Sequence, residues 1–435
     1  MSFAHRYHYP RASALEPRST GVGCLLVGDH DGLFRGLVAQ PRRVAVGLRT
    51  IGRTATSRFY LPPNVIAHLQ DPIATVAREA VRFESFSGCC STYARLDLDE
   101  QAFDRVDERT PGTTNVDFQA PMLAALARVR DDTEMAIEVG RTAVAVSAGD
   151  EQVVERKVPF PVRWLKGLGE VQAYLARMQP RFTLPRAEAL RFVRSLPATT
   201  RHETYVEPLG RGVRVTQRKS ADAVRVHGVE RLRLLTDLLP DCDGLRVYAD
   251  PFGASAWQAT LGPATLTLVL SPERWRGFSG EGQLLSTLAT ADADDVLARV
   301  RAQLRWQDRI DIDALADVAG VEPATAREAI AMLASRGLVG FDLRDGSWFH
   351  RELPFDLSRV EALHPRLQDA RKLVAAGAVT STRDGATVRS GDADYHITLS
   401  DEPTCTCPWF AQHQHERGPC KHVLAAQISA HEAAR

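Results

Sequence analysis

The chain has 435 residues, with 54 acidic and 54 basic side chains, so its formal net charge is zero. Hydrophobic residues make up 44% and charged residues 25%, a composition that indicates a folded protein and excludes a disordered or fibrous chain. Zero net charge also excludes a global attraction to nucleic acid or to an anionic membrane, so local patches must carry any such binding. The length is sufficient for about three domains with apolar cores.

Residues 1–10 lack the apolar core of a secretory signal, and no apolar run reaches the roughly 20 residues that span a bilayer. The seven cysteines show no paired disulfide framework. The adjacent Cys89 and Cys90 are typical of a small buried dipeptide, with a redox pair as the alternative. These features predict a cytoplasmic protein in a reducing compartment, without a membrane partner.

The first region, residues 1–118, is predicted to mix strands and helices, with a strand at Val44–Leu48 and a helix at Asp71–Phe83. Its first 60 residues interleave nine arginines with aromatic residues. This pattern favours a flexible basic arm followed by a solvated sheet face, and a surface for phosphates and stacked bases is the alternative.

An internal repeat organises the middle of the chain. The pattern Pro-x-Arg-Trp followed by Gly-Glu-x-Gln in residues 161–172 recurs at the same spacing in residues 272–283. Leucine-rich helices, short strands and closing helices flank both copies, which predicts two copies of one α+β unit at residues 119–200 and 226–305. We expect the repeated pattern to form a structural corner with its tryptophan in the core, and a binding hot spot is the alternative.

A connecting hairpin in residues 201–225 joins the two copies. Residues 211–219 alternate apolar and basic side chains on a predicted strand, which would place Arg214 and Arg218 on one face. Together with Lys219, these arginines are the candidate nucleic-acid contacts of the chain. A solvated hairpin explains the same pattern equally well.

Residues 306–356 resemble a winged helix-turn-helix. Residues 312–319 predict a first helix, Gly320 a turn and residues 324–336 a second helix, followed by a hairpin around Asp345-Gly346. The second helix offers few basic residues for reading DNA, and the first helix is acidic. We therefore predict a winged helix that docks protein or scaffolds the fold, with DNA binding as the alternative.

Two residue pairs near the C-terminus have spacings that indicate metal chemistry. Thiolates and neutral imidazoles are the usual ligands of Zn²⁺ in closed tetrahedral sites. Cys405 and Cys407 can converge from an extended segment, whereas Cys420 and His422 can share a metal only if a helix begins near them. Gly418-Pro419 would end any preceding helix, so a new helix can begin just after these residues. Ordinary buried cysteines or a disulfide are the alternatives, but a bridge between cysteines two residues apart is strained.

Cys-x-Cys after a predicted hairpin, followed by a loop and Cys-x-His at a helix start, resembles the SWIM zinc finger. The resemblance assigns Cys405, Cys407, Cys420 and His422 as the four ligands of one structural Zn²⁺ and gives the segment 362–435 a ββα fold. The segment Gly112–Phe118, the repeated Arg-Trp pattern, the winged helix and the finger together resemble a bacterial SWIM zinc-finger family protein of this length. The sequence thus predicts a multidomain α+β protein that ends in this finger.

The SWIM resemblance implies binding to DNA or protein and implies no reaction. We therefore expect a non-enzymatic scaffold or adaptor with a protein partner and without a small-molecule substrate. A DNA-binding factor that contacts phosphates through basic strands and the finger is the alternative. An enzyme with an unrecognised site is the second alternative, although the chain lacks a phosphate-binding loop, a nucleophile elbow and a dinucleotide fingerprint.

Overall fold

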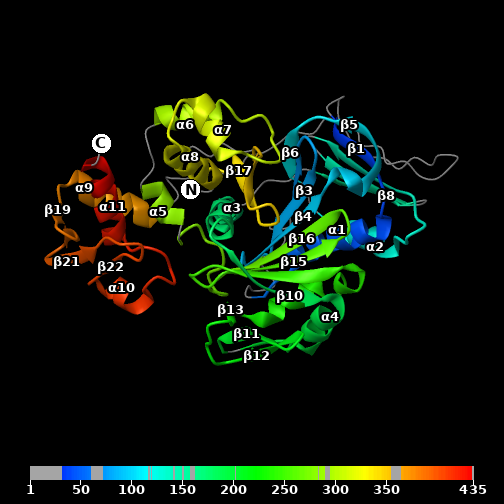
Figure 1. The fold of residues 1–435 in the computed structure, drawn as a ribbon, viewed down its shortest axis with the longest axis horizontal. Helices are drawn as coiled ribbons and strands as arrows, with labels where there is room; N and C mark the ends of the chain where they lie inside the picture. The colour runs from blue at the N-terminus through cyan, green and yellow to red at the C-terminus, as the bar shows by residue number, and fades with distance from the viewer. Residues whose placement is uncertain are drawn as a thin grey trace.

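The structure is a computed structural model that describes most of the chain beyond residue 31 (Figure 1). The described residues are 32–59, 72–115, 118, 120–140, 143–148, 151–156, 162–200, 202–282, 284–289, 294–353 and 364–433. The arginine-rich and aromatic residues before position 32 lie outside these ranges. Among the described helices, none is long and apolar enough to cross a membrane.

Two antiparallel sheets form the body of the molecule. The first has five strands in the order β5 (Phe103–Arg109), β1 (Gly32–Val38), β7 (Met135–Gly140), β8 (Ala143–Ala148) and β9 (Glu151–Arg156). The second has eight strands in the order β10 (Gln179–Pro185), β14 (Gly244–Ala249), β15 (Ser255–Leu261), β16 (Ala264–Leu270), β4 (Thr92–Leu98), β3 (Val81–Phe86), β2 (Ile73–Val76) and β6 (Gly112–Asn115). A short 3₁₀ turn, η2 (Glu100–Ala102), precedes β5. Hydrogen bonds between β4 and β16 therefore join chain segments that are far apart in sequence.

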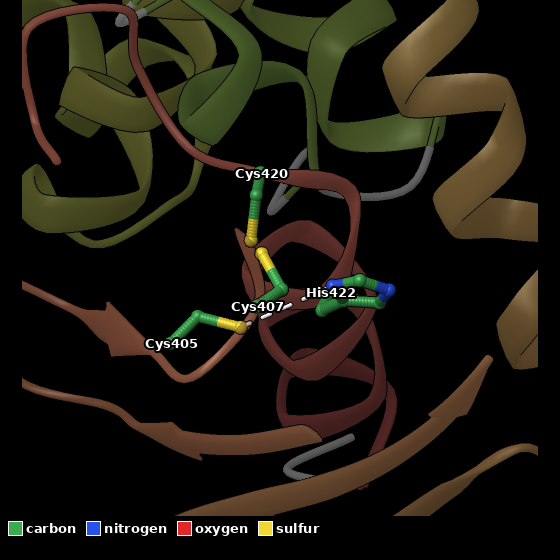
Figure 2. A group of neighbouring side chains, drawn as sticks. All are labelled: Cys405, Cys407, Cys420 and His422. Carbon is green, nitrogen blue, oxygen red and sulfur yellow. Dashed lines mark hydrogen bonds between the residues drawn. The ribbon is translucent and has the colours of Figure 1, made fainter. Parts of the chain in front are cut away.

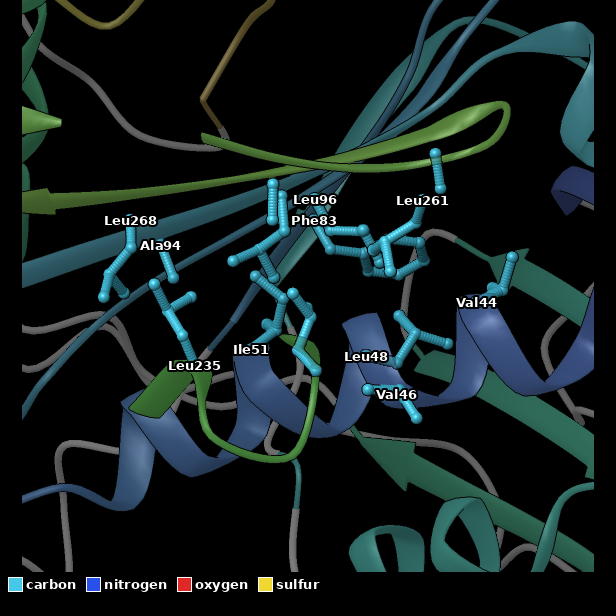
Figure 3. Packing of buried hydrophobic residues seen from close by; sticks show 14 of the residues in the cluster. Val44, Val46, Leu48, Ile51, Phe83, Ala94, Leu96, Leu235, Leu261 and Leu268 are labelled. Carbon is cyan, nitrogen blue, oxygen red and sulfur yellow. The ribbon is translucent and has the colours of Figure 1, made fainter. Parts of the chain in front are cut away.

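Helix α1 (Pro41–Thr56) packs against the eight-stranded sheet and forms the main apolar core with it. Figure 3 shows Leu48 and Ile51 of α1 facing Phe83 and Leu96 of the sheet. A side-chain carbon at Gly47 would lie 2.7 Å from Leu96, so glycine permits this close approach. Helix α2 (Ala120–Arg128) lies beside α1.

Two predicted elements of the N-terminal region are wrong. The predicted strand Val44–Leu48 lies inside α1, where Pro41 occupies the first turn and the apolar residues continue at helical spacing. The sequence also predicts a helix at Asp71–Phe83, but the described residues of this segment contain β2 and the start of β3. Both strands are fully buried, and pairing with neighbouring strands overrides the helix-like spacing of their apolar residues.

The predicted duplication of one α+β unit is not confirmed. In the first copy, β7 and β8 belong to the five-stranded sheet and Trp164 is buried in helix α3 (Val162–Leu175). In the second copy, β14 and β16 belong to the eight-stranded sheet, and Trp275 lies in a loop with 62% of its surface exposed. The predicted helix at residues 229–239 forms the 3₁₀ turns η3 (Val229–Leu235) and η4 (Leu239–Asp241).

A small lobe lies beside the edge of the eight-stranded sheet (Figure 1). It consists of helix α4 (Arg186–Ser195) and a three-stranded sheet in the order β12 (Gly212–Thr216), β11 (Thr204–Leu209) and β13 (Val224–Val226). Helix α4 packs against both β10 of the large sheet and β12 of the small sheet. It therefore connects the two sheets.

The region predicted as a winged helix forms two helices and a hairpin at the predicted positions. The elements are α7 (Ile312–Ala319), α8 (Pro323–Ser335), β17 (Val339–Asp342) and β18 (Ser347–His350), preceded by α5 (Leu284–Ala289) and α6 (Asp294–Arg301). The Asp311 carboxylate caps α7, and Gly320 ends it in the left-handed conformation. The C-terminal half of α8 is buried and contacts α3.

Buried charges attach this hairpin to the eight-stranded sheet. Arg351, directly after β18, pairs with Glu84 of β3, and neither side chain is exposed. Arg95 of β4 lies 3.4 Å from Asp342 of β17 and donates to the Phe341 carbonyl at 2.6 Å. Burial of such charges is costly unless they are paired, so the contact is specific and the hairpin is part of the body.

The last unit contains a four-stranded sheet and three helices. Its elements are α9 (Pro365–Ala375), β19 (Val379–Thr382), β20 (Gly385–Ser390), β21 (Ala393–Thr398), β22 (Thr404–Cys405), α10 (Pro408–His413) and α11 (Lys421–Ala433). The predicted hairpin and final helix are present, as is a helix predicted at residues 366–376, which is α9; two outer strands and α10 complete the unit. Helix α11 packs against α9 and α5, so one apolar core runs from α5–α8 into this unit.

Candidate metal centre

The four predicted ligands lie at the ends of three short elements. Cys405 ends strand β22, Cys407 caps the N-terminus of α10, and Cys420 directly precedes α11. His422 is the second residue of α11, so this helix begins between the second pair of ligands, as the spacing required. Figure 2 shows the four side chains pointing toward one another.

Their geometry fits one tetrahedral metal ion. The ligand atoms of the four residues lie within 4.8 Å of one another, and all four residues are buried. The Cys405 sulfur lies 3.9 Å from Nδ1 of His422 (Figure 2). A tetrahedral Zn²⁺ would separate such ligand atoms by roughly 3.5–3.8 Å, so a small inward movement closes the site around the ion. Among the described residues, this is the one group of His, Cys and acidic side chains with such geometry.

The helix N-termini prepare the sulfurs for a cation. The backbone N–H of Phe410 donates to the Cys407 sulfur, and that of Val423 donates to the Cys420 sulfur, each at 3.4 Å. Hydrogen bonds from Cys405 and His422 lower the pKa of the Cys420 thiol to about 4, whereas the same contact with Cys420 raises the pKa of Cys405. The lowered pKa of Cys420 and the backbone N–H donors to the sulfurs match the charge and the surrounding hydrogen bonds of a zinc–sulfur site.

Aromatic rings surround the cluster. Tyr395 of β21 stacks on His422 with ring centroids 4.3 Å apart, and Phe410 is buried beside Cys407. His415 is half-buried and packs against Phe410. His413 lies against Trp409, and neither histidine belongs to the ligand cluster.

The segment between α10 and Cys420, residues 414–419, is called the ligand loop here. It binds the body of the same molecule: Glu416 pairs with Arg225 of β13 at 2.9 Å, and Arg417 pairs with Glu273 at 2.5 Å. Gly418 has a φ of +71°, and a side-chain carbon there would collide with the backbone of Gly282. The loop that leads into a metal ligand is therefore also a polar contact between finger and body, beside the apolar packing of α11 on α5.

A charged cluster beside the ligand loop completes this contact. Arg366 of α9 donates to the carbonyls of Arg417 and Pro419 at 3.0 and 2.8 Å. Its guanidinium also lies 3.2 Å from the Glu281 carboxylate, which in turn lies 3.3 Å from buried His364. Burial alone would raise the pKa of Glu281, but the hydrogen bond from His364 and the charges of Arg366 and Lys166 outweigh it and lower the pKa to about 2.

Sequence reasoning missed the role of this cluster. Glu170 of the first repeated pattern accepts a hydrogen bond from the backbone of Gly280 in the second pattern, and Lys166 lies 3.4 Å from Glu281. The two Gly-Glu pairs therefore meet in space, although their backbones differ. The recurrence of Gly-Glu was the available signal, but sequence alone gave no indication that the two copies face each other.

The three candidate nucleic-acid residues lie on the small lobe, apart from the metal cluster. Arg214 is on β12, is 60% exposed, and pairs with Glu207 of β11. Strand β12 ends at Thr216, so exposed Arg218 and Lys219 follow it in a turn and do not share a strand face with Arg214. Their contact with nucleic acid stays a prediction.

The closed set of three cysteines and one histidine defines a structural zinc finger, because four protein ligands leave no position for a water molecule. Residues 395–430 match the SWIM zinc finger family. The C-terminal unit is therefore a SWIM zinc finger that fits one structural zinc ion, with the four ligands predicted. No curated protein matches the chain.

Two solved structures have distant similarity to part of the fold. Proliferating cellular nuclear antigen from Entamoeba histolytica aligns with a TM-score of 0.38 and 11% identity, over 55% of this chain and 98% of that chain. A PCNA2–PCNA3 complex from Sulfolobus tokodaii aligns with a TM-score of 0.41 and 7% identity, over 54% of this chain and 98% of the matched chain.

Proposed function

We propose that this protein is a non-enzymatic scaffold that binds a partner protein through the exposed surface of α7 and α8. This surface, called the acidic face here, surrounds Val318, which is 68% exposed in the last turn of α7. It carries five exposed carboxylates and one exposed arginine: Asp311, Asp313, Asp317, Glu322, Glu328 and Arg327. An exposed valine among carboxylates fits a basic partner segment with an apolar side chain, and this observation carries the proposal.

The winged helix serves here as a protein-docking unit. Its hairpin is held on the sheet by the buried Glu84–Arg351 pair, so the hairpin is not free to contact a DNA backbone. The second helix buries its C-terminal half against the body and presents Arg327 and Glu328 near its start. Arg327 lies 3.6 Å from Asp313, which offsets its charge. Phosphate binding through this unit would have little electrostatic support.

The charge of the finger supports a protein partner in the same way. Residues 364–433 contain seven arginines and lysines against eight aspartates and glutamates. Three cysteine thiolates with one Zn²⁺ would add a further negative charge. The alternative function, DNA binding through the finger, therefore has less support than protein binding. The closed zinc site supports a non-enzymatic role, because catalytic zinc needs an open coordination position.

A site-specific photo-crosslinker at position 318 tests the proposal in the native host. We expect a discrete protein adduct from this position, and we expect the double variant Asp313→Lys with Asp317→Lys to abolish it. A crosslinker at Val215, an exposed valine on the small lobe, is the matched control. The proposal fails if position 318 gives no adduct, if both positions give the same adduct, or if charge reversal leaves the adduct unchanged.

A further inference from the structure

The basic side chains of this neutral protein are concentrated on the small lobe. Residues 179–226 contain ten arginines and lysines against four acidic residues, an excess of six positive charges. The rest of the chain must therefore carry an excess of six negative charges, since the formal total is zero. Charge separation on this scale creates a local field that the net charge conceals.

The exposed part of this excess lies on two adjoining elements. Helix α4 packs beside β12, and Gly212 of β12 lies against the Glu188 side chain of α4. The surface, called the basic surface here, consists of seven exposed residues from the helix and from the hairpin with its following turn: Arg186, Arg191, Arg194, Arg211, Arg214, Arg218 and Lys219. Gly210 at the hairpin tip has a φ of +60° and open space around it, so the tip projects into solvent.

Most cations on this surface have no acidic partner, in contrast to those of α1. Arg191 pairs with Glu188 and Arg214 with Glu207, whereas the other five residues form no ion pair among the described residues. On α1, four arginines all lie within ion-pair distance of aspartates: Arg42, Arg43, Arg49 and Arg53. The arginines of α1 are thus neutralised, whereas five cations of the basic surface are available.

We propose that the basic surface binds the phosphate backbone of a nucleic acid. The described part of the lobe exposes Leu209 and Val215 as large apolar residues, but the seven cations outnumber them, so charge is the main feature that a ligand of this surface would meet. Membrane binding would require an amphipathic helix with an exposed apolar face, whereas α4 buries its apolar residues. Guanidinium groups spread over a helix and a hairpin suit phosphates, which need charge and hydrogen-bond donors.

Fluorescence anisotropy of the full chain with a labelled 20-base-pair DNA duplex tests this proposal. Five unpaired cations predict a slope of about −4.5 in a plot of log affinity against log salt, which is a loss of about 500-fold between 50 and 200 mM salt. The triple variant Arg211→Gln, Arg218→Gln and Lys219→Gln should shift this slope to about −2 and weaken binding. Thermal unfolding confirms that the variant remains folded.

The matched control is a triple variant of α1 with the same loss of charge: Arg42→Gln, Arg49→Gln and Arg53→Gln. We expect it to keep the wild-type salt slope. Absence of duplex binding at 50 mM salt, or an equal loss in both triple variants, would overturn the proposal. Equal affinity for polyglutamate or for anionic lipid vesicles would also overturn it, because a nucleic-acid surface should prefer the regular spacing of phosphates. Single-stranded RNA in a parallel titration identifies which nucleic acid is preferred.

Discussion

The β17–β18 hairpin and the zinc finger are both attached to the same body, but by different interactions. The hairpin is held by fully buried ion pairs such as Glu84–Arg351. The finger is held by the apolar core that α11 shares with α5 and by partly exposed contacts of the ligand loop, which leads into the metal ligand Cys420. We therefore expect the first attachment to persist without zinc and the second to weaken when zinc is removed.

Loss of a zinc ligand should have the largest effect. Cys420→Ser removes one of the four ligands, and we expect loss of stoichiometric zinc and unfolding of the finger, since structural zinc contributes on the order of 10 kcal/mol of apparent binding energy. Metal analysis of the purified protein measures this. Cys242→Ser is the control, because Cys242 is buried far from the cluster in sequence and is not a ligand. A Cys420→Ser protein with full zinc content would contradict the ligand assignment.

Removal of one partner of the buried hairpin pair should be next in size. Arg351→Met leaves Glu84 buried without its main cation, which should destabilise the body by about 3–5 kcal/mol while zinc content stays unchanged. Urea unfolding followed by circular dichroism measures the change. Arg309→Met breaks the exposed pair with Asp345 and should leave the free energy of unfolding nearly unchanged. Equal costs for both variants would show that burial of the pair is unimportant.

The Glu281 cluster should make the finger contact sensitive to acid. The pKa of Glu281 is lowered from 4.5 to about 2, so its carboxylate stabilises the folded state above pH 4.5, and this stabilisation is lost as the pH falls from 4.5 toward 2. Glu281→Gln should therefore cost about 2 kcal/mol at pH 7, after allowance for partial solvent screening, and much less at pH 3. Unfolding curves of both proteins across this range give the difference. A constant difference would exclude the ion pairs as its source.

A small change in the ligand loop should loosen the finger without removing its metal. Gly418→Ala places a side chain against the backbone of Gly282 in a left-handed conformation, at a cost of about 1–2 kcal/mol. We expect faster tryptic cleavage at Arg417 and unchanged zinc content. Gly391→Ala is the matched control, because Gly391 has a φ of +65° and no neighbour within 4 Å. Equal cleavage rates in both variants would attribute the effect to backbone strain alone.

The metal centre was predictable from sequence because its ligands are local. Cys405, Cys407, Cys420 and His422 lie within 18 consecutive residues, and their spacing alone limits the backbone around a metal. The helix-turn-helix was predictable for a similar reason, because the Asp311 cap, Gly320 and the apolar spacing all act within a few residues.

The errors arose where distant segments decide the structure. Residues 73–83 have helix-like spacing of apolar residues, but β2 and β3 pair with each other and with β6 and β4. The contact between Lys166 and Glu281 joins residues 115 positions apart, and no local pattern specifies it. The repeated Gly-Glu pattern was visible, yet it indicated a duplication because sequence similarity alone does not show that two segments touch.

Hydrogen exchange with and without a strong zinc chelator tests the central claim most directly. The claim is that zinc holds the finger and, through the ligand loop, fastens it to the body. We expect zinc removal to abolish protection in residues 404–433 and to reduce it in the contacting loop, residues 273–282, while β3, β4 and the hairpin β17–β18 keep their protection. Unchanged protection in residues 273–282, or a simultaneous loss in β3 and β4, would contradict the claim.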